Sequence, residues 1–148
     1  AVCLRKTDLE FSALNFANAI FDLEFEISGF EIFMRKLYQN RRKPAREGKK
    51  ITVGQTEAVP PGRGATVQLK GGGELALFNV GGKFYATENF CPHKGAPLAD
   101  SRLYGDVVEC DLHGWRFDVT SGECLTRRDC PIETYEVVVE DGWIKILV

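Results

Sequence analysis

Histidine and methionine are scarce in this sequence: among 148 residues there are two histidines and one methionine. Charge of one sign is not in excess either, because 19 Lys and Arg stand against 21 Asp and Glu, for a net charge of -2. This balance argues against a protein that binds nucleic acid through a strongly basic surface. The sequence also lacks an apolar run of membrane-spanning length and the basic head and apolar stretch of a secretory signal.

Cysteine is also sparse, with five residues, an odd count. This count fits a reducing compartment better than a disulfide framework, so we expect a cytoplasmic protein whose thiols are ligands or free. Cys124 and Cys130 leave two options open, a disulfide or two free thiols. Hydrophobic residues make up 44% of the chain, enough for a genuine core.

The composition changes near residue 44, which divides the chain into an N-terminal extension with a linker, residues 1–47, and a domain over residues 48–148. Capping boxes at Thr7–Glu10 and Ser28–Glu31 predict two helices in the extension. A hairpin is the alternative, because residues 21–27 alternate like a strand before Ser28-Gly29. The apolar positions follow helical spacing: Leu9, Ala13, Phe16, Ile20, Leu23, Ile27, Phe30, Met34 and Leu37.

From residue 51 onward the pattern is that of short β-strands. Glycine-rich turns separate them at residues 71–73, 81–82 and 141–142. Many short strands with such turns predict a mainly β fold, an antiparallel sandwich or barrel. The expected strands are Ile51–Val53, Ala65–Lys70, Glu74–Val80, Lys83–Thr87, Val107–Glu109, Arg116–Val119, Thr134–Glu140 and Trp143–Val148.

Both histidines lie close to cysteines, in two loops that contain glycine or proline. Cys91 and His93 form a C-x-H pair in CPHKG, and Cys110 and His113 form a C-x-x-H pair in CDLHGW. These four side chains are candidate metal ligands, for which two sites come into question. A Cys2His2 structural zinc usually pairs Cys with Cys and His with His. One Cys and one His in each loop favours a [2Fe–2S] cluster with two thiolates on one iron and two imidazoles on the other.

The stretch CPHKGAPL…CDLHGWRFD resembles the Rieske pattern, most closely that of soluble Rieske-type ferredoxins and of the small Rieske component of assimilatory nitrite reductases. The resemblance covers about residues 50–148, including the tail CPIETYEVVVEDGWIKILV. It implies a Rieske-type β fold with two cluster-binding loops. It also implies a [2Fe–2S] cofactor, with Cys91 and Cys110 on the inner iron and His93 and His113 on the outer one.

Four positions depart from the Rieske proteins of quinol-oxidising respiratory complexes, which lock their loops with a disulfide and place hydroxyl groups near the cluster. The matching positions hold Ala96 and Leu112 instead of cysteines, and Trp115 and Phe117 instead of Ser and Tyr. Hydroxyl donors favour the reduced, more negative state, so their loss lowers the potential. We therefore predict a low-potential cluster. We also expect Trp115 to pack under its loop rather than to relay electrons.

The resemblance implies a one-electron carrier that is not itself an enzyme and that passes electrons from a flavin-based reductase to an oxygenase or similar terminal enzyme. The alternative is a non-catalytic Rieske subunit of a larger enzyme such as nitrite reductase, with a dimer contact or docking through the extension. Gly95 and Gly114 are expected to let the loop backbones approach the cluster. Lys94 and Arg116 either steer an acidic partner or are simply solvated. Pro131 is expected in a third loop beside the cluster or at a strand start.

Overall fold

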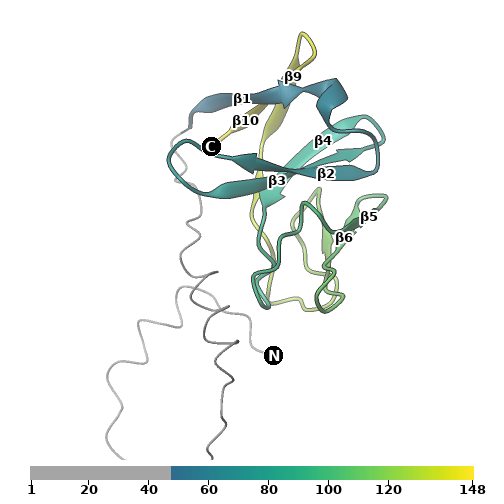
Figure 1. The fold of residues 1–148 in the computed structure, drawn as a ribbon. Helices are drawn as coiled ribbons and strands as arrows, with labels where there is room; N and C mark the ends of the chain where they lie inside the picture. Colours follow the sequence, from purple (N-terminus) through teal and green to yellow (C-terminus); the bar gives the residue numbers. More distant parts are fainter. Residues whose placement is uncertain (1–47) are drawn as a thin grey trace, which may run out of the picture.

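The computed structural model describes residues 48–148, which fold into three antiparallel sheets (Figure 1). The extension expected over residues 1–47, with its helices or hairpin, lies outside the described residues. Over the described part of the chain, no helix has the length and apolarity needed to cross a bilayer. The mainly β fold predicted from the sequence is confirmed.

The first sheet has the order β1-β10-β9, the second β2-β3-β4-β8 and the third β5-β6-β7. A short 3-10 turn, η2 (Thr56–Ala58), follows β1. The strands are β1 (Lys50–Gln55), β2 (Arg63–Gln68), β3 (Glu74–Val80), β4 (Lys83–Glu88), β5 (Arg102–Tyr104), β6 (Val107–Glu109), β7 (Arg116–Asp118), β8 (Thr134–Tyr135), β9 (Val137–Glu140) and β10 (Trp143–Leu147).

The glycine-rich turns join hairpins, as the sequence predicts: β2 to β3, β3 to β4 and β9 to β10. In the last of these, Asp141 has φ 52° and Gly142 has φ 77°. Two-residue hairpin turns that match strand twist need positive φ at both positions, which Asp-Gly supplies. Asp141 is the one non-glycine residue with positive φ among residues 48–148.

Two features of the strands differ from the sequence prediction. The single strand expected over Thr134–Glu140 is divided at Glu136, because β8 pairs with β4 whereas β9 pairs with β10. The chain therefore changes sheets at that residue. The strand β5 was not predicted, since its three residues include no β-branched side chain, whereas the equally short β6 begins with two valines.

Two hydrophobic cores share strand β3. Its side chains at Leu75 and Leu77 lie in the core against β10, while Ala76 and Phe78 lie in the core that contains both metal-ligand loops. All four are at most 2% exposed. A strand buried on both faces reads as a continuous apolar run, which accounts for the sequence LALF.

The third sheet and the loops form an insertion, residues 89–133, which we call the loop module. It leaves the second sheet after β4 and returns at β8, whose Thr134 pairs with Thr87. The amide of Glu88 donates to the carbonyl of Glu133 at 2.9 Å, so the two ends of the module are held together. Figure 1 shows β5 and β6 at the end of the domain away from β1 and β9.

Candidate metal centre

The two loops that carry the predicted ligands are closed in the same way. In the first, the Gly95 amide donates to the Cys91 carbonyl at 2.7 Å and the Cys91 amide to the Ala96 carbonyl at 2.9 Å. In the second, which joins β6 to β7, the Gly114 amide donates to the Cys110 carbonyl and the Cys110 amide to the Trp115 carbonyl, both at 2.8 Å. The structure thus contains two matching turns, each presenting one Cys and one His.

Both turns require glycine at the fifth position, counted from the cysteine. Gly95 has φ 74° and Gly114 has φ 70°, in the left-handed region that side chains with a Cβ rarely adopt. The backbone can therefore fold back on the cysteine carbonyl within a few residues.

The two cysteines lie together in the interior of the loop module. Cys91 and Cys110 are each 2% exposed, and both are free thiols that hydrogen-bond to one another. That bond, with burial, raises the pKa of Cys91, the thiol that donates. It lowers the pKa of Cys110, the sulfur that accepts, with help from the amides of Leu112 and His113. The pair therefore favours a thiolate at one sulfur even before a metal is considered.

The two histidines lie side by side, nearer the surface. Their ring centroids are 4.5 Å apart in an edge-to-face arrangement. His93 is half-buried whereas His113 is exposed. Burial, followed by the neighbouring His113 and Lys94 charges, lowers the pKa of His93. The neutral imidazole that results is the form that ligates metals.

The Nδ1 atom of His93 is buried and has no hydrogen-bond partner. It is the one side-chain nitrogen or oxygen in this condition among residues 48–148. A buried polar atom without a partner is rare in a native fold and calls for an explanation such as a missing ion. An iron bound at this nitrogen satisfies that requirement.

The four side chains form two pairs rather than one tetrahedron. Among residues 48–148, no three His, Cys, Asp or Glu side chains converge closely enough to hold a single ion. This argues against the zinc alternative, which needs four ligands around one point. A pair of buried sulfurs next to a pair of imidazoles fits two irons, each with one pair of ligands.

Trp115, in the second loop, packs against His93 of the first. The two rings are stacked, with centroids 4.6 Å apart and planes inclined by 2°, and Trp115 is 6% exposed. Phe117 is fully buried with its ring centroid 6.5 Å from that of Trp115. Neither side chain offers a hydroxyl group, as the sequence predicts. The stacking on His93 itself was not foreseen, because sequence spacing does not show which loops meet.

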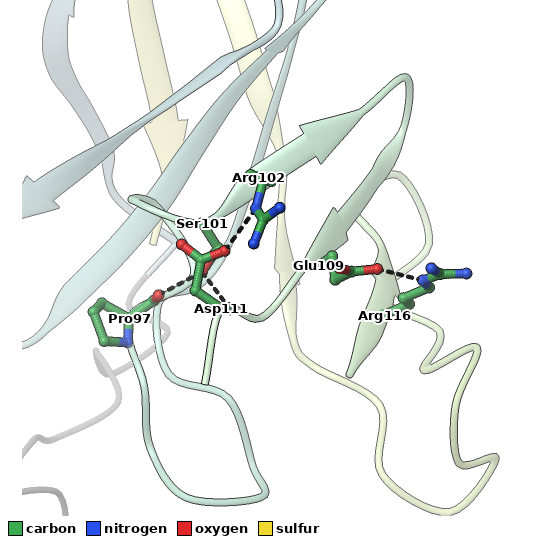
Figure 2. A network of polar contacts seen from close by, with 6 residues as sticks. All are labelled: Pro97, Ser101, Arg102, Glu109, Asp111 and Arg116. Carbon is green, nitrogen blue, oxygen red and sulfur yellow. Dashed lines mark hydrogen bonds and ion pairs between the residues drawn. The ribbon is translucent and has the colours of Figure 1, made fainter. Parts of the chain in front are cut away.

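Figure 2 shows the polar contacts that join the loops from outside. The hydroxyl of Ser101 donates to the Pro97 carbonyl at 3.0 Å and accepts from the Asp111 amide at 3.4 Å. Arg102 pairs with Asp111 at 3.2 Å. Arg116, considered above for steering a partner, pairs with Glu109 at 2.6 Å across β6 and β7. It therefore helps to hold the second loop's base.

The remaining sequence candidates lie around the centre. Ala96 is buried and Leu112 is 50% exposed, so the two positions differ in environment. Cys124 is a buried free thiol and therefore forms no disulfide with Cys130. Lys94 and Pro131 are both exposed in their loops.

Asn89, which the sequence did not single out, fastens the first loop to the second sheet. It is fully buried; its Oδ1 accepts from the amides of Leu98 at 3.1 Å and Ala99 at 2.9 Å, and its Nδ2 donates to Glu74 at 3.1 Å. An asparagine in a loop has many possible partners, so its position in the chain alone gives no indication of this role.

We expect Asn89→Ala to lower the free energy of unfolding by about 2 kcal/mol, since the Ala99 amide loses its acceptor in a buried place. The visible spectrum of the metal centre should change as well, because the first loop loses its anchor. Asn79→Ala is the matched control: Asn79 is also buried, and its side chain bonds Val59 and Gly82, which both lie outside the loop module. It should lower stability and leave the spectrum unchanged. A spectrum altered equally in both variants would contradict this assignment.

Comparison with known proteins places the chain in a family. Residues 49–136 match the model of the Rieske [2Fe-2S] domain. A ferredoxin component of naphthalene 1,2-dioxygenase/salicylate 5-hydroxylase systems from Ralstonia sp is 42% identical over 84 residues, 56% of this chain and 80% of that protein.

Two solved structures are also similar. A chain in a complex of reduced oxygenase and oxidised ferredoxin of carbazole 1,9a-dioxygenase is 33% identical with a TM-score of 0.64, over 68% of this chain and 94% of that one. A chain from Mycobacterium tuberculosis described as an NADH-dependent nitrite reductase small subunit is 26% identical with a TM-score of 0.62, over 66% and 93%. The family match contains both loops, the second sheet and the third sheet, and it covers more than half of the chain. The chain therefore belongs to the Rieske [2Fe-2S] domain family, whose cofactor is a [2Fe–2S] cluster.

Proposed function

We propose that Cys91 and Cys110 hold one iron of the [2Fe–2S] cluster and that His93 and His113 hold the other. The observation that carries this assignment is the pairing of the side chains, with sulfur next to sulfur inside and imidazole next to imidazole outside. The buried, unpartnered Nδ1 of His93 supports it further. These residues supply the mixed thiolate and imidazole donors that a Rieske cluster takes.

The bound cluster supplies reversible one-electron chemistry, and the chain sets its charge and access. Two thiolates offset the roughly two positive charges of an oxidised core, so the site is near neutral before it receives an electron. The buried cysteines keep the sulfur side away from water. The exposed His113 gives the other side a short, uncharged path to the surface.

The function that this geometry supports is that of a one-electron carrier between a reductase and a terminal oxygenase. The relative from Ralstonia is a ferredoxin component of dioxygenase systems, and the similar chain in the carbazole 1,9a-dioxygenase complex comes from an assembly of oxygenase and ferredoxin. These relatives support the partner class, and the exposed imidazole of His113 supports an exit route for the electron.

The test is reconstitution of aromatic-ring dihydroxylation. Naphthalene dioxygenase and its reductase, supplied with NADH and naphthalene but without their own ferredoxin, should form product when this protein is added. Product should depend on this protein's concentration, and its cluster should cycle between oxidised and reduced spectra. Reduction by the reductase without onward transfer to any of several such oxygenases would contradict the proposed terminal partner.

The potential of the cluster should lie at the lower end of the Rieske range, about -150 mV. The physical reason is the absence of hydroxyl donors at Trp115 and Phe117, which leaves the reduced state less stabilised. A dye-mediated titration followed by visible absorption measures the midpoint. A value near +300 mV, at the upper end, would contradict the low-potential assignment.

The second candidate is a permanent, non-catalytic subunit of a larger enzyme, which the similarity to the nitrite reductase small subunit favours. In that case residues 1–47 form a separate docking or dimerisation element ahead of the domain over residues 48–148. We expect a free carrier to be cytoplasmic and to elute from a size-exclusion column at its own mass of 16.5 kDa. A subunit should instead co-purify with a large partner. Removing residues 1–47 should leave the cluster intact and abolish only the association.

A further inference from the structure

The two imidazoles of the metal centre have different surroundings. His93 is half-buried and covered by the indole of Trp115, whose ring lies parallel to it at 4.6 Å. His113 is exposed, and its described ring contact is the edge-to-face one with His93. A pair of chemically equal ligands is thus placed in unequal environments.

The stacked contact joins the two loops directly, because Trp115 is the last residue of the second loop and His93 belongs to the first. An indole held at 6% exposure among buried neighbours is itself fixed, so the plane of the imidazole stacked on it is fixed too. Because the two rings are parallel and stacked, with planes inclined by 2°, tilting the His93 ring out of its plane would require the indole to move.

We propose that Trp115 is a positioning residue that fixes the ring plane of His93 and excludes water from one of its faces, leaving His113 as the imidazole through which electrons leave. This inference rests on the ligand assignment proposed above. It differs from a packing role because it concerns one of two ligands and not the loop as a whole.

Excluding water has a consequence for charge. Reduction adds a negative charge to a site that is near neutral, and water stabilises the more charged state. A smaller side chain at residue 115 admits water to His93 and so favours the reduced form. The potential should therefore rise as the cover is removed.

The experiment compares Trp115→Leu and Trp115→Phe with Trp143→Leu as the matched control. Trp143 is the second of the chain's two tryptophans and is 44% exposed on β10, outside the core that holds the loops. For Trp115→Leu we expect the equilibrium constant for reduction to rise about threefold to tenfold, tenfold being 59 mV for one electron. For Trp115→Phe we expect a smaller rise, because phenyl covers less of the imidazole. Trp143→Leu should leave it unchanged.

Pulsed EPR of the reduced proteins distinguishes positioning from general loosening. Of the two sets of histidine nitrogen couplings, one should change in the Trp115 variants and the other should stay as in the unmodified protein. Unchanged potential and couplings in cluster-loaded Trp115→Phe and Trp115→Leu would overturn the proposal, as would equal changes in both sets. If Trp115→Leu does not assemble the cluster, Trp115→Phe decides the outcome by the same two readouts. An unmodified protein without histidine nitrogen couplings would instead overturn the ligand assignment.

Discussion

Replacing Cys110 with Ser should yield a purified protein with almost none of the about two irons per chain that a [2Fe–2S] cluster contains. The thiolate is the ligand, and a serine hydroxyl does not ionise at neutral pH, so one iron loses half of its protein donors. The loss should be nearly complete because no side chain is placed to take over from Cys110: within residues 48–148, no three Cys, His, Asp or Glu side chains converge to hold an ion. Iron and sulfide analysis, with the visible spectrum, measures it.

Cys124 provides the control, because it is also a buried free thiol in the same core. Its sulfur accepts a hydrogen bond from the Arg127 amide at 3.3 Å, a local role that does not involve the metal. Cys124→Ala should therefore keep the full iron content. A Cys110→Ser protein that retains its cluster, or a Cys124→Ala protein that loses it, would contradict the proposed ligand set.

Gly122→Ala should cause a large loss of stability, on the order of 3 kcal/mol. Gly122 has φ 79°, and an added Cβ would fall against the carbonyl oxygen of Ile132 and lie 3.1 Å from Thr134 Cγ2. These are atoms of the chain that returns from the loop module, and Gly122 also accepts from the Ile132 amide at 2.8 Å. The backbone cannot give way without breaking that bond, so the midpoint of thermal unfolding should fall by more than about 10 °C.

Gly105→Ala is the control, because it introduces the backbone strain of a left-handed residue without the steric clash expected at Gly122. Gly105 has φ 63°, but a Cβ there would meet nothing within 4 Å. Its substitution should cost about 1 kcal/mol, the ordinary penalty of a left-handed conformation. Similar midpoints for the two variants would mean that the close approach of Gly122 to Ile132 is not what limits stability.

Most of the strands could be predicted because their signals are local. Alternation in residues 83–88 and the paired glycines at 81–82 each act within a few positions, and β3 and β4 form as expected. The division at Glu136 is different, because β8 pairs with β4, which lies far away in the chain, whereas β9 pairs with its neighbour β10. The alternating pattern of residues 134–140 does not indicate that the chain passes from one sheet to another at Glu136.

The same distinction applies to the metal centre. The Cys and His spacing was enough to propose the four ligands, because each loop is a short, self-contained turn closed by its own glycine. The contacts between the two loops could not be predicted from spacing in the same way. The stacking of Trp115 on His93 and the contacts of Asn89 depend on how the loops fold over the sheet.

The closure of the loop module at its two ends carries a topological consequence. Because Glu88 and Glu133 are hydrogen-bonded neighbours, the loop module leaves the second sheet and rejoins it at nearly the same point. Residues can therefore be added to the loop module or removed from it without a change in the register between β4 and β8. Transplanting the loop module onto another β scaffold would use this antiparallel pair as the junction, and it would also need apolar side chains in place of Ala76 and Phe78, which share the module's core.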